Sequence, residues 1–371
     1  MKLKKDYQLK NFRFPLVILV LALSFIGILV VGSAKESLQG RQIFGVMLGV
    51  IVMLTVALFD YNWILKFYWL MYIVNLILLI LVILVGKESH GAQRWLDLGF
   101  TTLQPSDLTK IFMILFFAKF LMKHEEDINK PKTIIKAVLL ILPTLGLIVI
   151  QPNLSNTICI SVLFCALMFL GGLSYKFIRN TLLIVVPLVF IFLFIAIQPN
   201  QPFLKPYQQK RILAWVYPDK YANKEAYQQI NSLMAIGSGQ ATGKGLNNTG
   251  VTSVKNGNFI SEPQTDFIFA IIGEELGFVG CCIVIILLLL IVIQCVLIGM
   301  RAQNLSGQII CGGIAALIAF QSFINISVAT RIFPNTGLPL PFVSYGLTSL
   351  VTFYIGIGLV LNVGLQPKKC K

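Results

Sequence analysis

The sequence predicts an all-α polytopic integral membrane protein, with about ten transmembrane helices and a long extracytoplasmic loop before the eighth. Three observations support this prediction. Apolar residues make up 57% of the 371 residues, charged residues make up only 12%, and the mean hydropathy is +0.83. Soluble domains have about 25% charged residues. The composition therefore excludes a cytosolic enzyme, a secreted disulfide scaffold and a disordered chain.

The expected spans follow from the apolar stretches, because a helix that crosses a bilayer needs about 20 mostly apolar residues. The fourth stretch carries Lys110 and Lys119 within it. The eighth is long enough to begin with a short turn of helix outside the membrane. The ten stretches are 14–33, 42–59, 63–85, 107–122, 134–150, 155–173, 178–198, 267–299, 308–330 and 342–364.

Basic residues predict the orientation, since short cytoplasmic loops are rich in Lys and Arg. With the N-terminus inside, sixteen Lys and Arg lie on the inner side and five in short outer loops. Ten spans return the C-terminus to the inside, so we expect both termini to be cytoplasmic. The net charge of +15 is then mainly an orientation signal, and we expect no nucleic-acid partner. The first apolar run is too long for a cleavable signal peptide and is expected to be an anchor.

One segment differs from the short loops. Residues 199–265 form a 67-residue stretch rich in Gln, Asn, Gly and Lys, and loops beyond about 12–15 residues are usually functional or disordered. Its Tyr and Trp residues favour structured pieces at the membrane boundary. We treat residues 1–371 as a single membrane domain that includes this extracytoplasmic loop.

Two common kinds of site are not predicted. His90 and His124 fall on opposite sides of the expected membrane, so no His/Cys zinc cluster can form between them. The Gly243-Lys244 pair lacks the earlier glycine and the following Ser or Thr of a phosphate-binding loop. A Gly45-x-x-x-Gly49 pattern fits either a helix contact with a partner or internal packing.

The first polar cluster near the membrane contains Arg94, Gln104, Ser106, Asp107 and Lys110. Asp107 is expected in the first turn of a helix, where the helix dipole favours an anion. Lys110 follows three residues later on the same face. One interpretation is a capped helix with a local ion pair. The other is a polar outer cavity in which Arg94 and Lys110 meet an anionic group.

Acidic residues form a second cluster where the long loop enters the eighth span. Asp266, Glu274 and Glu275 lie there. Taken alone, Asp266 is more often a helix N-cap than a catalyst. Charged groups beside lipid are costly and often mark a functional site, so both interpretations stay open.

A third segment, residues 333–346, has three prolines and a glycine before Ser344. Irregular backbone at membrane depth is tolerated only where it is buried or lines a cavity. The segment is either a stiff turn between the last two spans or part of a site.

Six motifs together resemble the SEDS family, which includes RodA, FtsW and SpoVE. They occur in the family's order and extend over nearly the whole chain, and those at 243–245 and 338–342 are more typical of RodA. The motifs are GAQRWLDLG at 91–99, QPSDLTK at 104–110, QPNLSNT at 151–157, IGSGQATGKG at 236–245, TDFIFAIIGEELGFVG at 265–280 and PNTGLPLPFVSYG at 334–346.

Two departures from the family pattern concern acidic positions. Asp107 stands where the family usually has Glu. Asn153 stands where the family usually has Asp, so a carboxylate is missing there.

The resemblance implies a peptidoglycan glycosyltransferase in the bacterial cytoplasmic membrane, acting in elongation or division. The substrate would be lipid II, and the 4-hydroxyl of its GlcNAc would attack a lipid-linked MurNAc with inversion, releasing undecaprenyl pyrophosphate. Asp266 is the expected general base, made more basic by partial burial beside Phe267 and Phe269. The expected substrate-binding residues are Arg94, Gln104, Ser106, Asp107, Lys110, Arg211, Lys244, Glu274 and Ser344.

Cations or a metal ion should stabilise the leaving pyrophosphate. We predict no protein-built metal centre and leave open a divalent cation, Mg²⁺ or Mn²⁺. The resemblance also implies a class B penicillin-binding protein as the transpeptidase partner. A lipid II flippase and a membrane scaffold for such a partner are the alternatives. The flippase is disfavoured because the ionisable groups cluster towards the outer surface.

Overall fold

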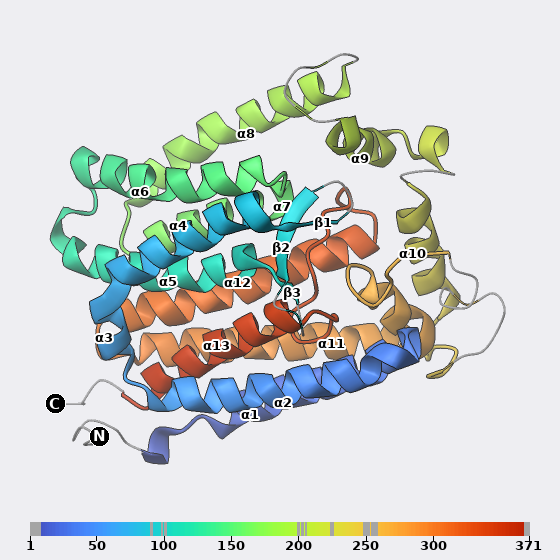
Figure 1. Cartoon of the computed structure of the whole chain (residues 1–371), viewed down its shortest axis with the longest axis horizontal. Coiled ribbons are helices and arrows are strands. Elements are labelled where there is room, and N and C mark those ends of the chain that lie inside the picture. The colour runs from blue at the N-terminus through green and yellow to red at the C-terminus, as the bar shows by residue number, and fades with distance from the viewer. Residues whose placement is uncertain are drawn as a thin grey trace.

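The computed structural model describes residues 9–89, 92–97, 99, 102–198, 201, 204, 206–222, 226–247, 253 and 259–366. Long helices lie side by side in a bundle (Figure 1). They are α1 (Phe14–Ala34), α2 (Glu36–Leu58), α4 (Tyr68–Val85), α5 (Pro105–Lys123), α6 (Pro131–Ile150), α7 (Leu154–Leu170), α8 (Tyr175–Ile197), α11 (Ile268–Met300), α12 (Leu305–Ala329) and α13 (Leu347–Gly364). The shorter helices are α3 (Tyr61–Ile64), α9 (Pro206–Val216) and α10 (Tyr227–Ser238), with 3-10 turns η1 (Leu9–Asn11), η2 (Leu65–Phe67), η3 (Glu125–Asp127) and η4 (Pro218–Tyr221).

The predicted fold class, a polytopic helical membrane protein, is confirmed. Each of the ten predicted stretches coincides with one of the long helices. Within the described part of the chain, eight helical segments are long and apolar enough to cross a membrane. Helix α7 has 17 residues, and α5 carries four charged side chains. That all ten helices cross the membrane stays a prediction.

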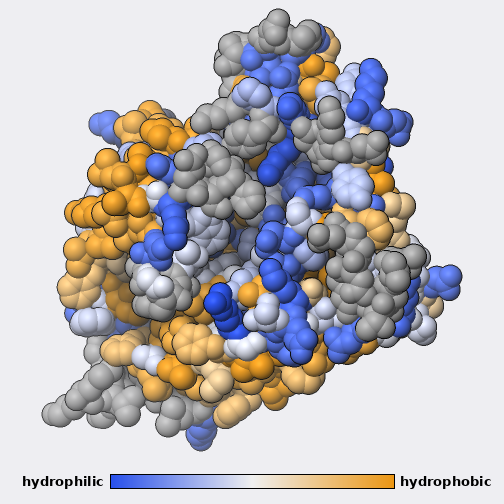
Figure 2. Space-filling view, turned by 45° about the vertical axis from the view of Figure 1, so that its right-hand side comes forward, coloured by the Kyte–Doolittle hydropathy of each residue, from blue (hydrophilic) through white to orange (hydrophobic). Residues whose placement is uncertain are grey.

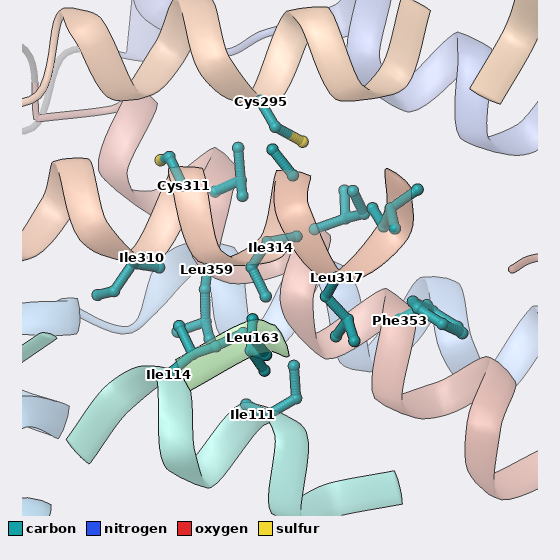
Figure 3. Packing of buried hydrophobic residues seen from close by; sticks show 14 of the residues in the cluster. Ile111, Ile114, Leu163, Cys295, Ile310, Cys311, Ile314, Leu317, Phe353 and Leu359 are labelled. Atoms are coloured by element: carbon teal, nitrogen blue, oxygen red, sulfur yellow. The ribbon is translucent and has the colours of Figure 1, made fainter. Parts of the chain in front are cut away.

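Helices α12 and α13 form the centre of the bundle, because neighbouring helices cover them on several sides. The most apolar stretch of α13 is 78% buried and that of α12 is 61% buried, against 6% for α8. Helix α12 packs against α5, α7, α11 and α13. Figure 3 shows this contact, made by Ile111, Ile114, Leu163, Cys295, Ile310, Cys311, Ile314, Leu317, Phe353 and Leu359.

The Gly45 and Gly49 pattern is used inside the molecule. A Cβ atom at Gly49 would meet the ring of Tyr354, and one at Gly45 would lie 3.1 Å from Leu347 Cδ1. Both neighbours belong to α13. The small residues therefore let α2 approach α13 closely, which favours internal packing over a partner contact.

Two regions contain structure beyond the predicted helices. A small antiparallel sheet of order β1-β2-β3 is formed by β1 (Lys87–Ser89), β2 (Ala92–Asp97) and β3 (Thr102–Leu103). Lys87 Nζ lies 2.7 Å from Asp97 Oδ2, and this hydrogen bond holds the pKa of that exposed carboxyl below its ordinary value. The long segment 199–265 contains α9, η4 and α10, which lie at the same end of the bundle as the sheet (Figure 1). We call this the polar end.

Candidate functional site

Helix α5 brings a buried ion pair to the polar end. The helix begins at Pro105. Proline suits the first helical position because the N–H of that position has no partner within the helix, so its absence loses no hydrogen bond. Lys110 Nζ lies 2.8 Å from Asp107 Oδ1, and the two side chains are 1% and 6% exposed. The predicted local ion pair is therefore present, but both charges are withdrawn from water.

Ser106 joins the start of α5 to the start of α7. Its Oγ accepts hydrogen bonds from Gln104 Nε2 at 3.1 Å, Asn156 Nδ2 at 3.0 Å and Asn153 Nδ2 at 3.4 Å. Asn153 also caps α7, since its Oδ1 accepts from the backbone N–H of Asn156 at 3.3 Å. An amide can both donate and accept here, whereas a carboxylate could only accept. The change from the family's Asp is thus accommodated by this hydrogen-bond cluster.

Arg94 on β2 holds the turn between α6 and α7. Its Nε donates to the carbonyl of Gln151 at 3.3 Å, and one Nη donates to the carbonyl of Pro152. Arg94 therefore has a structural contact that the sequence did not suggest. Its guanidinium is half-buried, and those two nitrogens are already engaged with protein.

Two amides on α12 connect the ion pair with the irregular 333–346 segment. Gln321 accepts from Lys110 Nζ at 3.1 Å and donates to the Pro339 carbonyl at 2.9 Å. Asn325, one turn further on, donates to the carbonyls of Leu338 at 2.7 Å and Asp266 at 2.9 Å. Both amides are at most 1% exposed. They were not among the predicted site residues.

Asp266 lies in a turn directly before α11, beside the 333–346 segment. The N-cap of α11 is Phe267, so the alternative of Asp266 as the helix N-cap is wrong. Asp266 is half-buried, between the fully buried Gln264 and Phe267. A Cβ atom at Gly337 would come within 3.3 Å of Asp266 Oδ2. The glycine leaves the carboxylate room against the loop.

Ser344 fixes the 333–346 segment against the turn that carries Asp266. Its Oγ donates to the Thr265 carbonyl at 2.6 Å and accepts from the backbone N–H of Leu340 at 2.8 Å. The N–H of Tyr345 donates to the Gln264 carbonyl at 2.9 Å. The 333–346 segment is therefore hydrogen-bonded to the carbonyls of Gln264 and Thr265, in the turn that carries Asp266. Ser344 positions this turn and is itself buried.

Helix α11 is interrupted at Gly277, and the 239–246 segment forms backbone hydrogen bonds with the residues on both sides of the interruption. Gly277 has φ 66° and ψ −164°, a conformation essentially restricted to glycine. Lys244 and Gly245 donate their N–H groups to the carbonyls of Glu274 and Glu275 at 3.0 and 2.9 Å. In return, the N–H groups of 278 and 279 donate to the carbonyls of 240 and 241 at 2.8 and 3.1 Å.

Side-chain contacts also hold the segments that meet at the break in α11, which we call the junction. Lys244 Nζ lies 3.0 Å from Glu274 Oε1, with the lysine side chain 29% exposed and the glutamate side chain 3% exposed. Ser33 on α1 donates to Glu275 Oε1 at 2.5 Å. The two glutamates are thus buried and held by neighbours, as expected for acids near lipid.

The structure brings most of the predicted residues to one end of the bundle, where they lie in separate groups. Gln104, Ser106, Asp107 and Lys110 lie at the start of α5, and Asp266 and Ser344 lie across α12. Glu274 and Lys244 form a third group at the break in α11. Arg211 on α9 is exposed and donates to the Asn335 carbonyl at 3.3 Å, so it reaches the 333–346 segment from outside.

The polar end is hollowed. Figure 2, which turns this end towards the viewer, shows a recess bordered by hydrophilic residues between apolar flanks. Among the described residues, no three His, Cys, Asp or Glu side chains lie together as a metal-binding group. The groups that this end offers for a reaction are therefore the half-buried Asp266 carboxylate and the cationic and amide side chains near it.

Comparison with known proteins gives one consistent family. The family model of FtsW, RodA and SpoVE, described as "Cell cycle protein", matches residues 7–369. The peptidoglycan glycosyltransferase MrdB of Escherichia coli K12 is 32% identical, over 98% of this chain and 97% of its own.

Two solved structures have the same fold. One, from work on the structural coordination of polymerization and crosslinking by a peptidoglycan synthase complex, has a TM-score of 0.80 at 28% identity, covering 95% of this chain and 97% of its own. The other, the rod shape determining protein RodA of Thermus thermophilus, has a TM-score of 0.70 at 26% identity, covering 97% and 98%.

Proposed function

The chain belongs to the FtsW/RodA/SpoVE family of cell cycle proteins, and from this premise we propose that it is a peptidoglycan glycosyltransferase that polymerises glycan chains. The likeness to a peptidoglycan glycosyltransferase extends over 98% of the chain. One observation in the structure carries the assignment to a site: the half-buried carboxylate of Asp266 at the hollowed polar end.

The reaction assigns Asp266 the role of general base. The acceptor is the 4-hydroxyl of the GlcNAc of lipid II, and a sugar hydroxyl is a weak nucleophile until its proton is removed. A positioned base contributes about 10²–10⁴-fold to such a step. The oxygen attacks C1 of the lipid-linked MurNAc, the bond to undecaprenyl pyrophosphate breaks, and attack opposite the leaving group inverts the configuration.

Cations near the leaving group would stabilise its charge. Lys244 and Arg211 are the better candidates for direct contact, because their side chains are accessible. Lys110 is buried and paired, and Arg94 already binds two carbonyls. We therefore assign Lys110 and Arg94 to positioning the starts of α5 and α7, with Gln104, Ser106 and Asp107. Glu274 orients Lys244, and Ser344 orients the turn of Asp266.

A divalent cation, where one is used, fits this end of the molecule only together with substrate. The described residues offer no group of three ligating side chains, and Mg²⁺ commonly binds through one or two carboxylates plus substrate phosphates. Mg²⁺ or Mn²⁺ would then be held mainly by the pyrophosphate and would neutralise part of its charge.

The polyprenyl chain of the substrate needs an apolar surface open to lipid. Helix α8 supplies one, since its side chains from Leu183 to Phe194 are mostly exposed and apolar. Figure 1 shows α8 at the margin of the bundle, leading towards α9 at the polar end. We place the lipid tail along α8, with its pyrophosphate near Arg211.

The protein is a membrane protein, and its setting follows from the family. We place it in the bacterial cytoplasmic membrane with both termini cytoplasmic. The start of α1 and the end of α13 lie at the same end of the bundle, opposite the polar end, which agrees with this orientation (Figure 1). A solved relative is described as part of a peptidoglycan synthase complex that polymerises and crosslinks, which supports a class B penicillin-binding protein as the partner.

Asp266→Asn tests the proposal in purified protein supplied with lipid II. We expect polymerisation to fall by about 10²–10⁴-fold, because the amide cannot accept the proton. Asp219→Asn, an exposed carboxylate on η4 in the same long segment, is the matched control and should polymerise normally. Normal glycan chains from Asp266→Asn would refute the assigned base.

The same protein in vesicles separates polymerase from transporter. A flippase would move lipid II across the bilayer of the vesicle without forming polymer. A scaffold would be indifferent to Asp266→Asn in both assays. Polymer formed without movement of lipid II is the result that we expect.

A further inference from the structure

A second polar feature lies at the opposite end of the bundle from Asp266. A cavity of about 100 Å³ opens where α1 begins and where α11 and α13 end. It is lined by Asn11, Arg13, Ile298, Arg301 and Gly364. A cavity of this volume exceeds the room that one water molecule needs.

The guanidinium groups of the two arginines in this lining have no polar partner in the part of the chain that the structure describes. Arg13 Nε is shielded from solvent and has no hydrogen-bond partner. Within the described part of the chain, neither Arg13 nor Arg301 forms an ion pair or a side-chain hydrogen bond. Leaving a buried donor without an acceptor carries a free-energy cost. A bound acceptor would remove this cost.

The arginines are also not needed to cap the helices that end beside them. At the end of α11, the carbonyls of Ile298 and Gly299 accept from the N–H groups of Arg301 and Ala302 at 3.1 and 3.0 Å. At the end of α13, the carbonyls of 361 and 363 accept from the N–H groups of 365 and 366 at 3.0 and 3.1 Å. These four terminal carbonyls already have backbone donors.

Among the described residues, the cavity wall contains two positive charges and no acidic residue, so its complement is an anion. Guanidinium groups bind phosphate oxygens with paired hydrogen bonds, which a single point charge does not do. An exposed apolar side chain adjoins each arginine in the sequence: Phe14 directly follows Arg13 and is 63% exposed, and Met300 directly precedes Arg301 and is 73% exposed. An anionic group with attached hydrocarbon fits both parts of this surface.

We propose that the cavity between the start of α1 and the ends of α11 and α13 binds a phosphate group, as carried by the headgroup of an anionic phospholipid. Arg13 and Arg301 hold the phosphate oxygens, and the acyl chains lie against Phe14 and Met300. The site is separate from the polymerisation site at the polar end and does not depend on the role of Asp266.

Native mass spectrometry of the full-length purified chain, titrated with phosphatidylglycerol, measures the binding. We expect Arg13→Gln and Arg301→Gln each to weaken it about tenfold, the loss typical of a hydrogen bond to a charged group. Arg179→Gln, at an exposed arginine in the first turns of α8, is the matched control and should bind as the wild type does. Polymerisation by Arg301→Gln should be unchanged, which shows that the variant is folded.

Inorganic phosphate as a competitor distinguishes the two sources of the anion. If millimolar phosphate displaces the lipid from wild type, the site recognises the phosphate group itself. If it does not, the lipid headgroup and its hydrocarbon are both required. Arg13→Lys, which keeps the charge but loses the paired donors, should bind with intermediate affinity. Equal losses for Arg13→Gln, Arg301→Gln and Arg179→Gln, or no loss for any, would overturn the proposal.

Discussion

Removing Lys110 tests whether the buried ion pair holds the polar end together. Lys110→Met leaves the carboxylate of Asp107, only 6% exposed, without its cation at 2.8 Å. Breaking a buried pair from one side costs about 3–5 kcal/mol, because the remaining charge is uncompensated. Gln321 also loses the donor to its Oε1. We expect Lys110→Met to lose about 3–5 kcal/mol of stability.

The chain contains a matched control for this change. Asp127 and Lys130 have the same spacing as Asp107 and Lys110, and their charged atoms lie 2.6 Å apart, but their side chains are 50% and 68% exposed. Exposed pairs contribute about 0–1 kcal/mol. Denaturation in mixed detergent micelles, followed by tryptophan fluorescence, compares Lys110→Met with Lys130→Met. Equal losses would refute the reasoning, since burial is the main difference between the pairs.

The double variant separates stability from activity. Replacing a buried pair by apolar residues of similar volume is often neutral or stabilising, so Asp107→Leu/Lys110→Met should recover most of the stability lost by Lys110→Met. Its polymerisation of lipid II should nevertheless stay low, because the connection from Lys110 through Gln321 to the 333–346 segment is gone. A stable double variant with full activity would remove Lys110 and Asp107 from the site.

Three further changes test other contacts. Gly277→Ala should lower the thermal unfolding midpoint, because a Cβ there would lie 2.7 Å from the Ala241 carbonyl and the residue's φ is 66°; the strain is about 1–3 kcal/mol, and an unchanged midpoint contradicts it. Lys244→Gln should lower kcat for lipid II about tenfold, because it removes a cation that stabilises the charge developing on the leaving pyrophosphate; steady-state polymerisation kinetics measure it, and an unchanged kcat would exclude this role. Gln321→Leu should lower kcat with KM nearly unchanged, because it frees the Pro339 carbonyl and the loop beside Asp266; an unaltered kcat would exclude this positioning role.

Much of the fold could be predicted because lipid imposes a simple rule on sequence. Apolar runs of about 20 residues located the long helices, since a bilayer tolerates few other structures. The tenth span was expected from residue 342, whereas α13 begins at Leu347. Phe342 has a φ of 64° and Gly346 one of 158°, so the chain turns there before the helix can start.

The small sheet at the polar end was not anticipated. Its strands have two to six residues, too short to display the alternation that marks a half-buried strand. Residues 91 and 98 of the first SEDS motif, and the neighbouring residues 90, 100 and 101, lie outside the described residues. This motif indicates the family and does not by itself indicate strands.

The site was predicted where its residues are neighbours in sequence and missed where they are not. Asp107 and Lys110 were paired because they lie three residues apart on a helix. The sequence does not indicate Gln321 or Asn325, because an amide in an apolar helix shows no partner until the helix is packed. Their spacing of four residues puts them on one face, and this was the available signal. The four backbone hydrogen bonds at the break in α11 cannot be predicted from the sequence, since they join residues 30 or 38 positions apart.

The three acids that the sequence places near the membrane boundary differ in how deeply they are buried. Glu274 and Glu275 are each 2% exposed, and they contact Lys244 and Ser33 at the break in α11. Their charges stabilise the junction that fixes the start of α11. Asp266, in the turn before that start, is half-buried. A general base must come within hydrogen-bond reach of a substrate hydroxyl, and among these three acids Asp266 has the accessible carboxylate. In the proposed mechanism, the two glutamates hold the first turns of α11 in place, and Asp266 acts on the substrate directly.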